Sequence, residues 1–216
     1  MRFPTQRLVF GDLGFCKLSS GKVFDLEIDV EGGVDEGRPK VEYAFVDFVN
    51  KFRRIFMNRD ELIRRYTAGE RDFAGIKFSD PGLDGIDLSG ADLTGNDMEE
   101  FYLARAILKA VSLVNAKLFE ACLDGTDLTE ADLRGADLRR ARLDVANLTN
   151  ADLRQARFHK TRFYRANLIG ANLSGTDLGG CDFWEANLTG ANLKGANLHR
   201  TTFRNTIMSD GTIRNS

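Results

Sequence analysis

Basic and aromatic side chains gather in one stretch of this 216-residue chain. Between positions 134 and 165 there are nine arginine or lysine residues against three aspartates. Tyr164 lies inside this stretch, and the single tryptophan, Trp184, follows it. Arginine, tyrosine and tryptophan dominate the binding energy of protein interfaces, so the chemistry indicated here is non-covalent recognition. The candidate partner-binding residues are Arg142, Arg157, Arg162, Tyr164, Arg165 and Trp184.

Residues that could perform catalysis or hold a metal ion are few and scattered. His159 and His199 are forty positions apart, and Cys122 and Cys181 have no neighbour that marks them as activated. The sequence contains no nucleophile–base pair, no glycine-rich phosphate loop before a helix and no metal-ligand spacing. We therefore expect a protein that is not an enzyme, with no catalytic, metal-binding or cofactor-binding residues and no cofactor.

A strict period of five residues positions the candidate site. From Phe73 to Met208 every fifth residue is large and apolar, which makes 28 repeats without an insertion or deletion. This period matches neither a helix nor a strand, so it indicates a repeat architecture. The residue two places before each column member is mostly alanine, and the residue just before it is usually Asp or Asn. Large and small apolar side chains can interlock inside a narrow tube, and the other three positions face water.

The repeated motif is Ala-[Asp/Asn]-[Leu/Phe]-x-x, as in residues 131–135 and 186–190. It resembles the motif of the pentapeptide repeat family, which is abundant in cyanobacteria, and the resemblance spans residues 71–210. It implies an all-β solenoid, a right-handed quadrilateral β-helix with four repeats to a coil. Coils of such a solenoid would stack about 4.8 Å apart.

Residues twenty apart would then share a face. Phe163, Phe183 and Phe203 are expected to stack inside the tube, and an amide ladder of Asn147, Asn167 and Asn187 is expected outside it. From Asp127 to Asn197 the Asp/Asn row has three exceptions, all of them arginine: Arg142, Arg157 and Arg162.

Other segments flank the repeats. Residues 1–56 are expected to form a small α+β N-terminal extension, with a strand through Phe24, Leu26, Ile28 and Val30 and a helix over about 41–56. An alternative left open is that this extension is dispensable. Residues 57–70 are expected to form a helical cap that starts at Asn58, has Leu62, Ile63 and Tyr66 as its apolar side and stops at Gly69. Residues 207–213 are expected to cover the other end of the tube, and residues 211–216 form the C-terminal tail.

The overall composition limits the compartment and the partners. The net charge is −2, and the chain has no apolar run long enough to span a membrane. The N-terminus lacks the features of a secretory signal, and three cysteines are too few for a disulfide framework. We expect a cytoplasmic protein that does not bind membranes.

The leading functional hypothesis is a protein–protein interaction scaffold whose partner presents an acidic surface. An alternative is a solvated wall on which the N-terminal segment half-covers Trp184. Some members of the family mimic DNA and bind gyrase, but the basic middle of this chain disfavours that function. Anion or nucleic-acid binding at the basic belt is a further, less favoured alternative. The sequence leaves open a homodimer, the identity of any partner and the biological process.

Overall fold

The computed structural model describes residues 9–10, 15–17, 23–25 and 56–215. The chain divides into two compact units, Met1–Arg54 and Ile55–Ser216. In the first unit, strands β1 (Val9–Phe10), β2 (Phe15–Lys17) and β3 (Val23–Asp25) form an antiparallel sheet in that order.

Two expectations for the N-terminal segment can be compared with these strands. Phe24 lies in β3, but Leu26, Ile28 and Val30 lie outside the described residues, as does the helix expected from position 41 up to position 55. Phe56 was expected to be the last residue of that helix, and this is wrong. It begins strand β4 (Phe56–Met57), which pairs in parallel with β5 (Lys77–Phe78).

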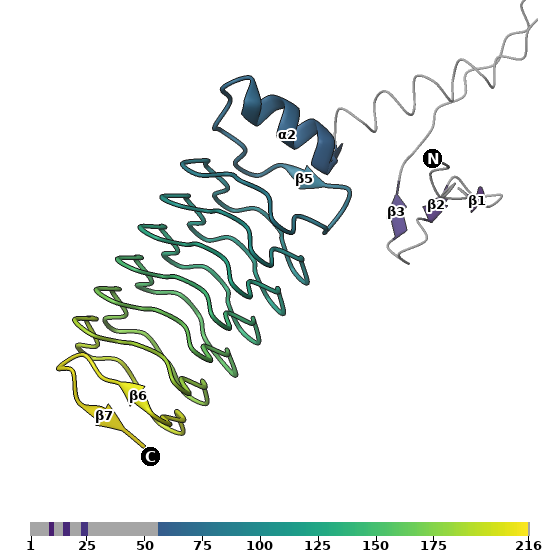
Figure 1. Ribbon diagram of the computed structural model, residues 1–216. Helices are drawn as coiled ribbons and strands as arrows, with labels where there is room; N and C mark the ends of the chain where they lie inside the picture. Colours follow the sequence, from purple (N-terminus) through teal and green to yellow (C-terminus); the bar gives the residue numbers. More distant parts are fainter. Residues whose placement is uncertain (1–8, 11–14, 18–22, 26–55, 216) are drawn as a thin grey trace, which may run out of the picture. The chain divides into compact units, whose positions relative to one another are not determined.

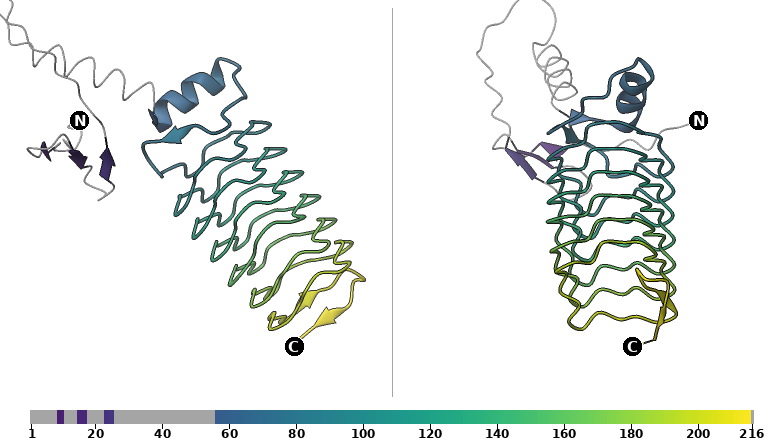
Figure 2. Two further views of the ribbon diagram at one scale, coloured as in Figure 1. Left: turned by 180° about the vertical axis from the view of Figure 1, so that it is seen from behind. Right: turned by 90° about the vertical axis from the view of Figure 1, so that its left-hand side faces the viewer.

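The second unit is a stack of coils in which one residue of each repeat bridges to the residue twenty positions later (Figures 1 and 2). Parallel bridges of this kind run from Asp72↔Asp92 to Asn187↔Ile207. Four repeats of five residues therefore make one coil. Two backbone hydrogen bonds make each bridge: at Asn147↔Asn167, the Leu148 amide donates to the Asn167 carbonyl at 2.7 Å and the Asn167 amide donates to the Ala146 carbonyl at 2.9 Å.

The interior of the stack is apolar and tightly packed. The large column residues from Leu83 to Leu188 are almost completely buried, and the alanines of the small row lie between them. The expected aromatic ladder is confirmed, with ring centroids 4.6 Å apart for Phe163 and Phe183 and 5.9 Å apart for Phe183 and Phe203. Cys181 occupies an alanine position and is buried, as expected for a small apolar filler.

Each buried polar residue of the small row uses its side-chain donor in a hydrogen bond, although the Asn96 side-chain oxygen is buried without a partner. The Thr126 hydroxyl donates to the carbonyl of Leu103 at 2.9 Å, and the Thr161 hydroxyl donates to that of Leu138 at 2.8 Å. Asn96 makes the equivalent bond to the Phe73 carbonyl at 2.9 Å. In these three cases the acceptor lies 23 positions earlier, so the adjacent coil satisfies a donor whose burial would otherwise be costly.

Outside the tube, the Asp/Asn row stabilises the turns. The side-chain oxygen of Asp132 accepts a hydrogen bond from the Arg134 amide at 3.1 Å, and Asn172 does the same for Ser174 at 3.2 Å. This is an Asx-type turn, which explains why Asp and Asn recur just before the column. The amide ladder is confirmed at its first step, where Asn167 donates to the Asn147 oxygen at 3.3 Å.

Helix α2 (Arg59–Thr67) lies at the N-terminal end of the stack (Figure 1). As expected, the Asn58 side chain caps it by accepting a 2.8 Å hydrogen bond from the Glu61 amide. Leu62 is fully buried in the core of the stack, and the Tyr66 hydroxyl donates to the Ser89 carbonyl at 2.8 Å. Ile63 is exposed, so its expected place on the apolar side of the helix is wrong.

At the other end, strand β6 (Thr206–Ile207) pairs antiparallel with β7 (Ile213–Arg214). Ile213 is largely exposed, and Leu193 and Leu198 are only half-buried. The expected cover of this end is therefore only partial: Met208 packs against the core and the Arg214 guanidinium lies 4.3 Å from the Phe203 ring centroid, but Ile213 does not close the tube. The tail pairs instead with one exposed strand edge, because the two-residue strand β7 is too short to cross the opening.

A charge placed in the column tests this interior. Leu168→Asp should lower the free energy of unfolding by more than about 4 kcal/mol, or prevent folding, because a carboxylate would be buried without a partner. The matched control is Ile169→Asp, one position further along and 38% exposed, which should have little effect. Urea unfolding followed by circular dichroism measures both, and equal stability of the two variants would contradict the assignment of Leu168 to the interior.

Candidate functional site

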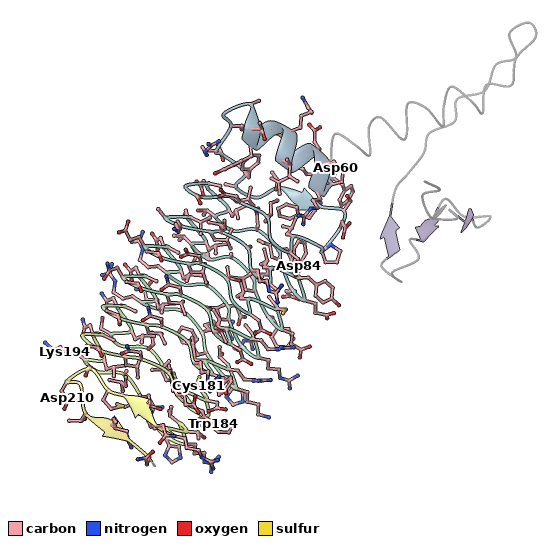
Figure 3. The ribbon with its side chains drawn as sticks, viewed as in Figure 1. Asp60, Asp84, Cys181, Trp184, Lys194 and Asp210 are labelled. Atoms are coloured by element: carbon pink, nitrogen blue, oxygen red, sulfur yellow. The ribbon has the colours of Figure 1, made fainter. Side chains whose placement is uncertain are left out.

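One face of the stack gathers most of the candidate residues. We call it the aromatic face; it consists of residues 81–85, 101–105, 121–125, 141–145, 161–165, 181–185 and 201–205. Bridges connect Cys122, Arg142, Arg162 and Asp182 in one row along it. Arg157 is not on this face, because its bridges to Asp137 and Asp177 place it on the neighbouring one. In Figure 3, Asp84 marks the end of the aromatic face near α2, and Trp184 lies near its other end.

Tyr164 and Trp184 form the centre of the candidate site. Their rings meet edge-to-face, with centroids 5.4 Å apart and an interplanar angle of 62°. The guanidinium of Arg165 lies 5.1 Å from the Tyr164 ring centroid, and that of Arg204 lies 5.3 Å from the Trp184 ring centroid. Trp184 is still 39% exposed. Two rings held by cation–π contacts thus form a pre-ordered apolar ridge on the surface.

The aromatic face carries a second, displaced row of carboxylates. Where Gly82, Cys122 or Arg142 replaces the usual Asp or Asn, an aspartate occurs two positions later, as Asp84, Asp124 or Asp144. The carboxylate of Asp84 accepts a hydrogen bond from the Ala104 amide at 3.0 Å, and that of Asp124 accepts one from the Asp144 amide at 3.1 Å. Each of these amides belongs to a repeat of the next coil that has no Asp or Asn at its own acceptor position. The displaced aspartates thus restore turn bonds that the substitutions removed.

The same aspartates hold the arginines of the face. Arg142 forms an ion pair with Asp124, and Arg162 pairs with Asp144 at 2.5 Å. Arg165 pairs with Glu185 at 2.6 Å. Since each pair joins neighbouring coils, the guanidinium groups are fixed along the face.

Asp144 is the most deeply buried member of this network. One carboxylate oxygen pairs with Arg162, and the other is buried without a hydrogen-bond partner. Burial raises the pKa of Asp144 above its ordinary value of 3.8. The positive charge of Arg162 lowers it in part, and the negative charge of Asp124 raises it further.

Val145, next to Asp144, has an unfavourable backbone conformation. Its φ is 61°, in the left-handed region that β-branched residues rarely adopt, and its side chain is 60% exposed. The same corner position carries glycine in other repeats, for example Gly125 on the same face. Strain of this kind often occurs at binding sites, where a side chain is needed in spite of its cost.

The basic surplus seen in the sequence is not a surplus on the surface. Of the nine basic residues between 134 and 165, eight form ion pairs, and only Lys160 has none within residues 56–215. Glu120, Asp124 and Asp132, which lie before that stretch in the sequence, supply three of the acids, and Glu185 follows it. Counting charges along the stretch missed these partners, because Asp132 lies just before it and the other three belong to adjacent coils.

The described residues offer little material for catalysis. Burial raises the pKa of the Cys181 thiol to about 12, which keeps it protonated. Cys122 is half-buried and its thiol donates to the Asp124 carboxylate. Within the part of the chain that was searched, no three potential ligands lie close enough together to hold a metal ion. The described helix is also too short to cross a membrane.

Comparison with known proteins identifies the repeat. The family model for pentapeptide repeats matches in eight copies, over residues 86–125, 112–144, 146–184 and 171–210. The chain belongs to the pentapeptide repeat family. Members of this family form a right-handed quadrilateral β-helix, and the four-repeat coil observed here agrees with that architecture.

Several solved pentapeptide repeat proteins are similar to the chain. One from the Arabidopsis thaliana thylakoid lumen is 35% identical over 50% of this chain and 66% of its own length, with a TM-score of 0.31. HetL, involved in heterocyst differentiation regulation in the cyanobacterium Nostoc, is 27% identical over 73% of this chain and its whole length, with a TM-score of 0.24. QnrB1, a plasmid-mediated fluoroquinolone resistance protein, is 19% identical over 65% of this chain and 67% of its length, with a TM-score of 0.33. No curated protein matches the chain.

The raised pKa of Asp144 gives a stability change of defined sign. A folded-state pKa above the unfolded value means that this group stabilises the fold below about pH 3.8 and that the contribution is lost as pH rises through the folded pKa. Asp144→Asn, which removes the charge, should therefore be at least as stable as the natural protein at pH 7, and its advantage should shrink toward pH 4.

Asp152→Asn is the control, because a hydrogen bond from Arg154 lowers the pKa of Asp152. That substitution should destabilise the protein at pH 7 and lose its effect on acidification. Chemical denaturation at the two pH values measures both variants. A destabilised Asp144→Asn protein at pH 7 would show that the ionised pair is net favourable.

Relief of the strain at Val145 is a separate test. Val145→Asn should raise the free energy of unfolding by about 1 kcal/mol, because asparagine tolerates the left-handed conformation better than valine. Asn150→Gly, at the next corner of the coil, should change stability much less, since asparagine is already tolerated there. Thermal melts compare the two, and an unchanged or lower melting temperature for Val145→Asn would mean that valine is not strained.

Proposed function

We propose that this protein is a non-enzymatic scaffold that binds another protein through the aromatic face. The ridge of Tyr164 and Trp184 carries the proposal, because it presents exposed aromatic surface that the surrounding ion pairs hold in place. Side chains ordered before binding lose little conformational entropy when a partner docks. Membership of a family that includes interaction proteins supports the same function.

The geometry refines the partner that we propose. Arg142, Arg162 and Arg165 each have an acidic neighbour on the chain, so the face holds five basic and five acidic residues. We therefore propose a partner that contributes an apolar or aromatic segment to the Tyr164–Trp184 ridge. Its polar groups would exchange with the ion pairs around the rings. The acidic partner surface expected from the sequence stays a prediction. It has less support than before, because the arginines that suggested it are paired with carboxylates of the chain itself.

The DNA-mimic function ranks second. A mimic of DNA needs a strongly acidic surface, and the ten charged residues of the aromatic face cancel. QnrB1 is described as a plasmid-mediated fluoroquinolone resistance protein, but its likeness to this chain concerns the fold alone. Nucleic-acid binding loses support as well, because its argument rested on the same basic stretch. The cytoplasmic location also stays a prediction, since one similar protein comes from a thylakoid lumen.

Truncation of the two rings tests the proposal. Tyr164→Ala combined with Trp184→Ala should leave the melting temperature within a few degrees of the natural value, because both rings project outward. The same variant should reduce capture of the partner by at least tenfold, as expected for hot-spot aromatics. Quantitative pull-down from the source cells, with mass spectrometry, measures capture.

Ile169→Ala is the matched control, because Ile169 is as exposed as Trp184 but lies on another face. Proteins that are retained by the control and lost with the ring variant are partners of the aromatic face. Equal retention of every captured protein by the two variants would reject the aromatic face as the binding surface.

A further inference from the structure

A second face of the stack has its charges separated along the tube. We call it the divided face; it consists of residues 76–80, 96–100, 116–120, 136–140, 156–160, 176–180 and 196–200. The first three of these repeats contain five acidic and two basic residues, which gives a net charge of −3. The last four contain two acidic and five basic residues, which gives +3, and they also contain both histidines of the chain.

The other three faces show no comparable separation. When it is divided in the same way, after the third repeat, the aromatic face has net charges of −1 and +1. The same values hold for the face made of the five-residue repeats that begin at 71–75, recur every twenty positions and end at 191–195. The remaining face carries −2 and −1. The separation is therefore specific to one face and does not reflect a gradient along the whole tube.

Part of the charge on the divided face is already paired. Arg139 and Arg157 both pair with Asp137, Arg140 pairs with Glu120, and Lys117 pairs with Asp97. Within residues 56–215, most of the exposed charged residues of this face that have no ion pair match the sign of their half. They are Asp80, Glu99 and Glu100 on the α2 side, and Lys160 and Arg200 on the side of the C-terminal hairpin, whereas Lys77 and Asp177 have the opposite sign. These free charges remain available to a partner.

A central aromatic contact marks the boundary between the two halves. Phe119 is half-buried, and the guanidinium groups of Arg139 and Arg140 lie 5.5 and 5.7 Å from its ring centroid. Further along the basic half, two of the three outward positions of repeat 176–180 are Gly179 and Gly180, which have no side chain. This repeat lies between those of Lys160 and Arg200, so the two unpaired cations flank a shallow depression in the surface.

We propose that the divided face binds the same face of a second copy of this chain in antiparallel orientation. A two-fold axis that lies in the interface and is perpendicular to the tube axis brings the acidic half of each copy against the basic half of the other. A two-fold axis parallel to the tube would instead place like charges together. The charge separation thus selects one of the two symmetric arrangements, and the attraction acts twice in each dimer.

The size of the face sets the strength of this dimer. Seven repeats with three outward positions each provide 21 residues, at the lower end of the about 20–30 residues per partner in a standard interface. Most of them are polar. The dimer should therefore be weak and sensitive to salt, because exposed charges are screened over about 10 Å at 0.1 M ionic strength.

Charge reversal on the full-length chain tests the arrangement. The acid-reversed variant carries Glu99→Lys and Glu100→Lys, and the base-reversed variant carries Lys160→Glu and Arg200→Glu. Each variant alone should stay monomeric at low salt, because both halves of its divided face then have the same sign. An equimolar mixture of the two should form a dimer, and so should the chain that carries all four substitutions. Sedimentation velocity at about 50 and 500 mM NaCl measures association, and the dissociation constant of the natural protein should rise at least tenfold between these conditions.

The control variant carries Arg105→Glu and Lys194→Glu, which change the net charge by the same amount as the base-reversed variant but lie on other faces. It should dimerise like the natural protein, and so should the variant that lacks the Tyr164 and Trp184 rings. A natural protein that is monomeric at about 100 μM and low salt would overturn the proposal. A dimer that persists in each singly reversed variant, or a mixture that fails to associate, would overturn it as well. None of these outcomes bears on the proposed function of the aromatic face.

Discussion

The parallel pairing of backbone segments twenty positions apart determines the other features of the repeat stack. It requires that each coil contain the same number of residues, so that every leucine or phenylalanine of the column falls behind another. In a strand, a slip of one residue turns inward side chains outward, and the same holds for these short segments. The 28 repeats without an insertion or deletion are the sequence record of that requirement.

The constraint applies to the inward positions and leaves the outward ones free, provided that the turns keep their hydrogen bonds. The aromatic face shows how this condition is met. Where Cys122 replaces the Asx acceptor, Asp124 two positions later accepts a bond from the Asp144 amide of the next coil, whose own repeat carries Arg142 in place of an acceptor. The same aspartate then pairs with the arginine. One carboxylate therefore repairs the backbone and orients the side chain that caused the loss.

The period that does not change was sufficient to predict the apolar column. The number of repeats in a coil came from the resemblance to the pentapeptide repeat family. With that number, the aromatic ladder and the neighbours Tyr164 and Trp184 could be placed, since twenty residues separate equivalent positions. The ion pairs of the aromatic face were missed because their partners lie one coil away, where a count along the chain does not place them. The row of Asp84, Asp124 and Asp144 had a visible signal, as aspartate follows the column only in these three repeats. Phe56 and Ile63 were misplaced because apolar residues at helical spacing do not show where a helix starts or which of them meets the core.

The regular stacking also gives the surface a fixed spacing. Equivalent side chains on successive coils lie about 4.8 Å apart, whereas successive turns of an α-helix lie 5.4 Å apart. A helix laid along the tube would therefore drift by about 2.4 Å after four coils and lose its match with the rows of side chains. A partner built from stacked strands, including another solenoid, would stay in step over the full length. The tube thus acts as a ruler that discriminates between partners by their secondary structure before any individual side chain is compared.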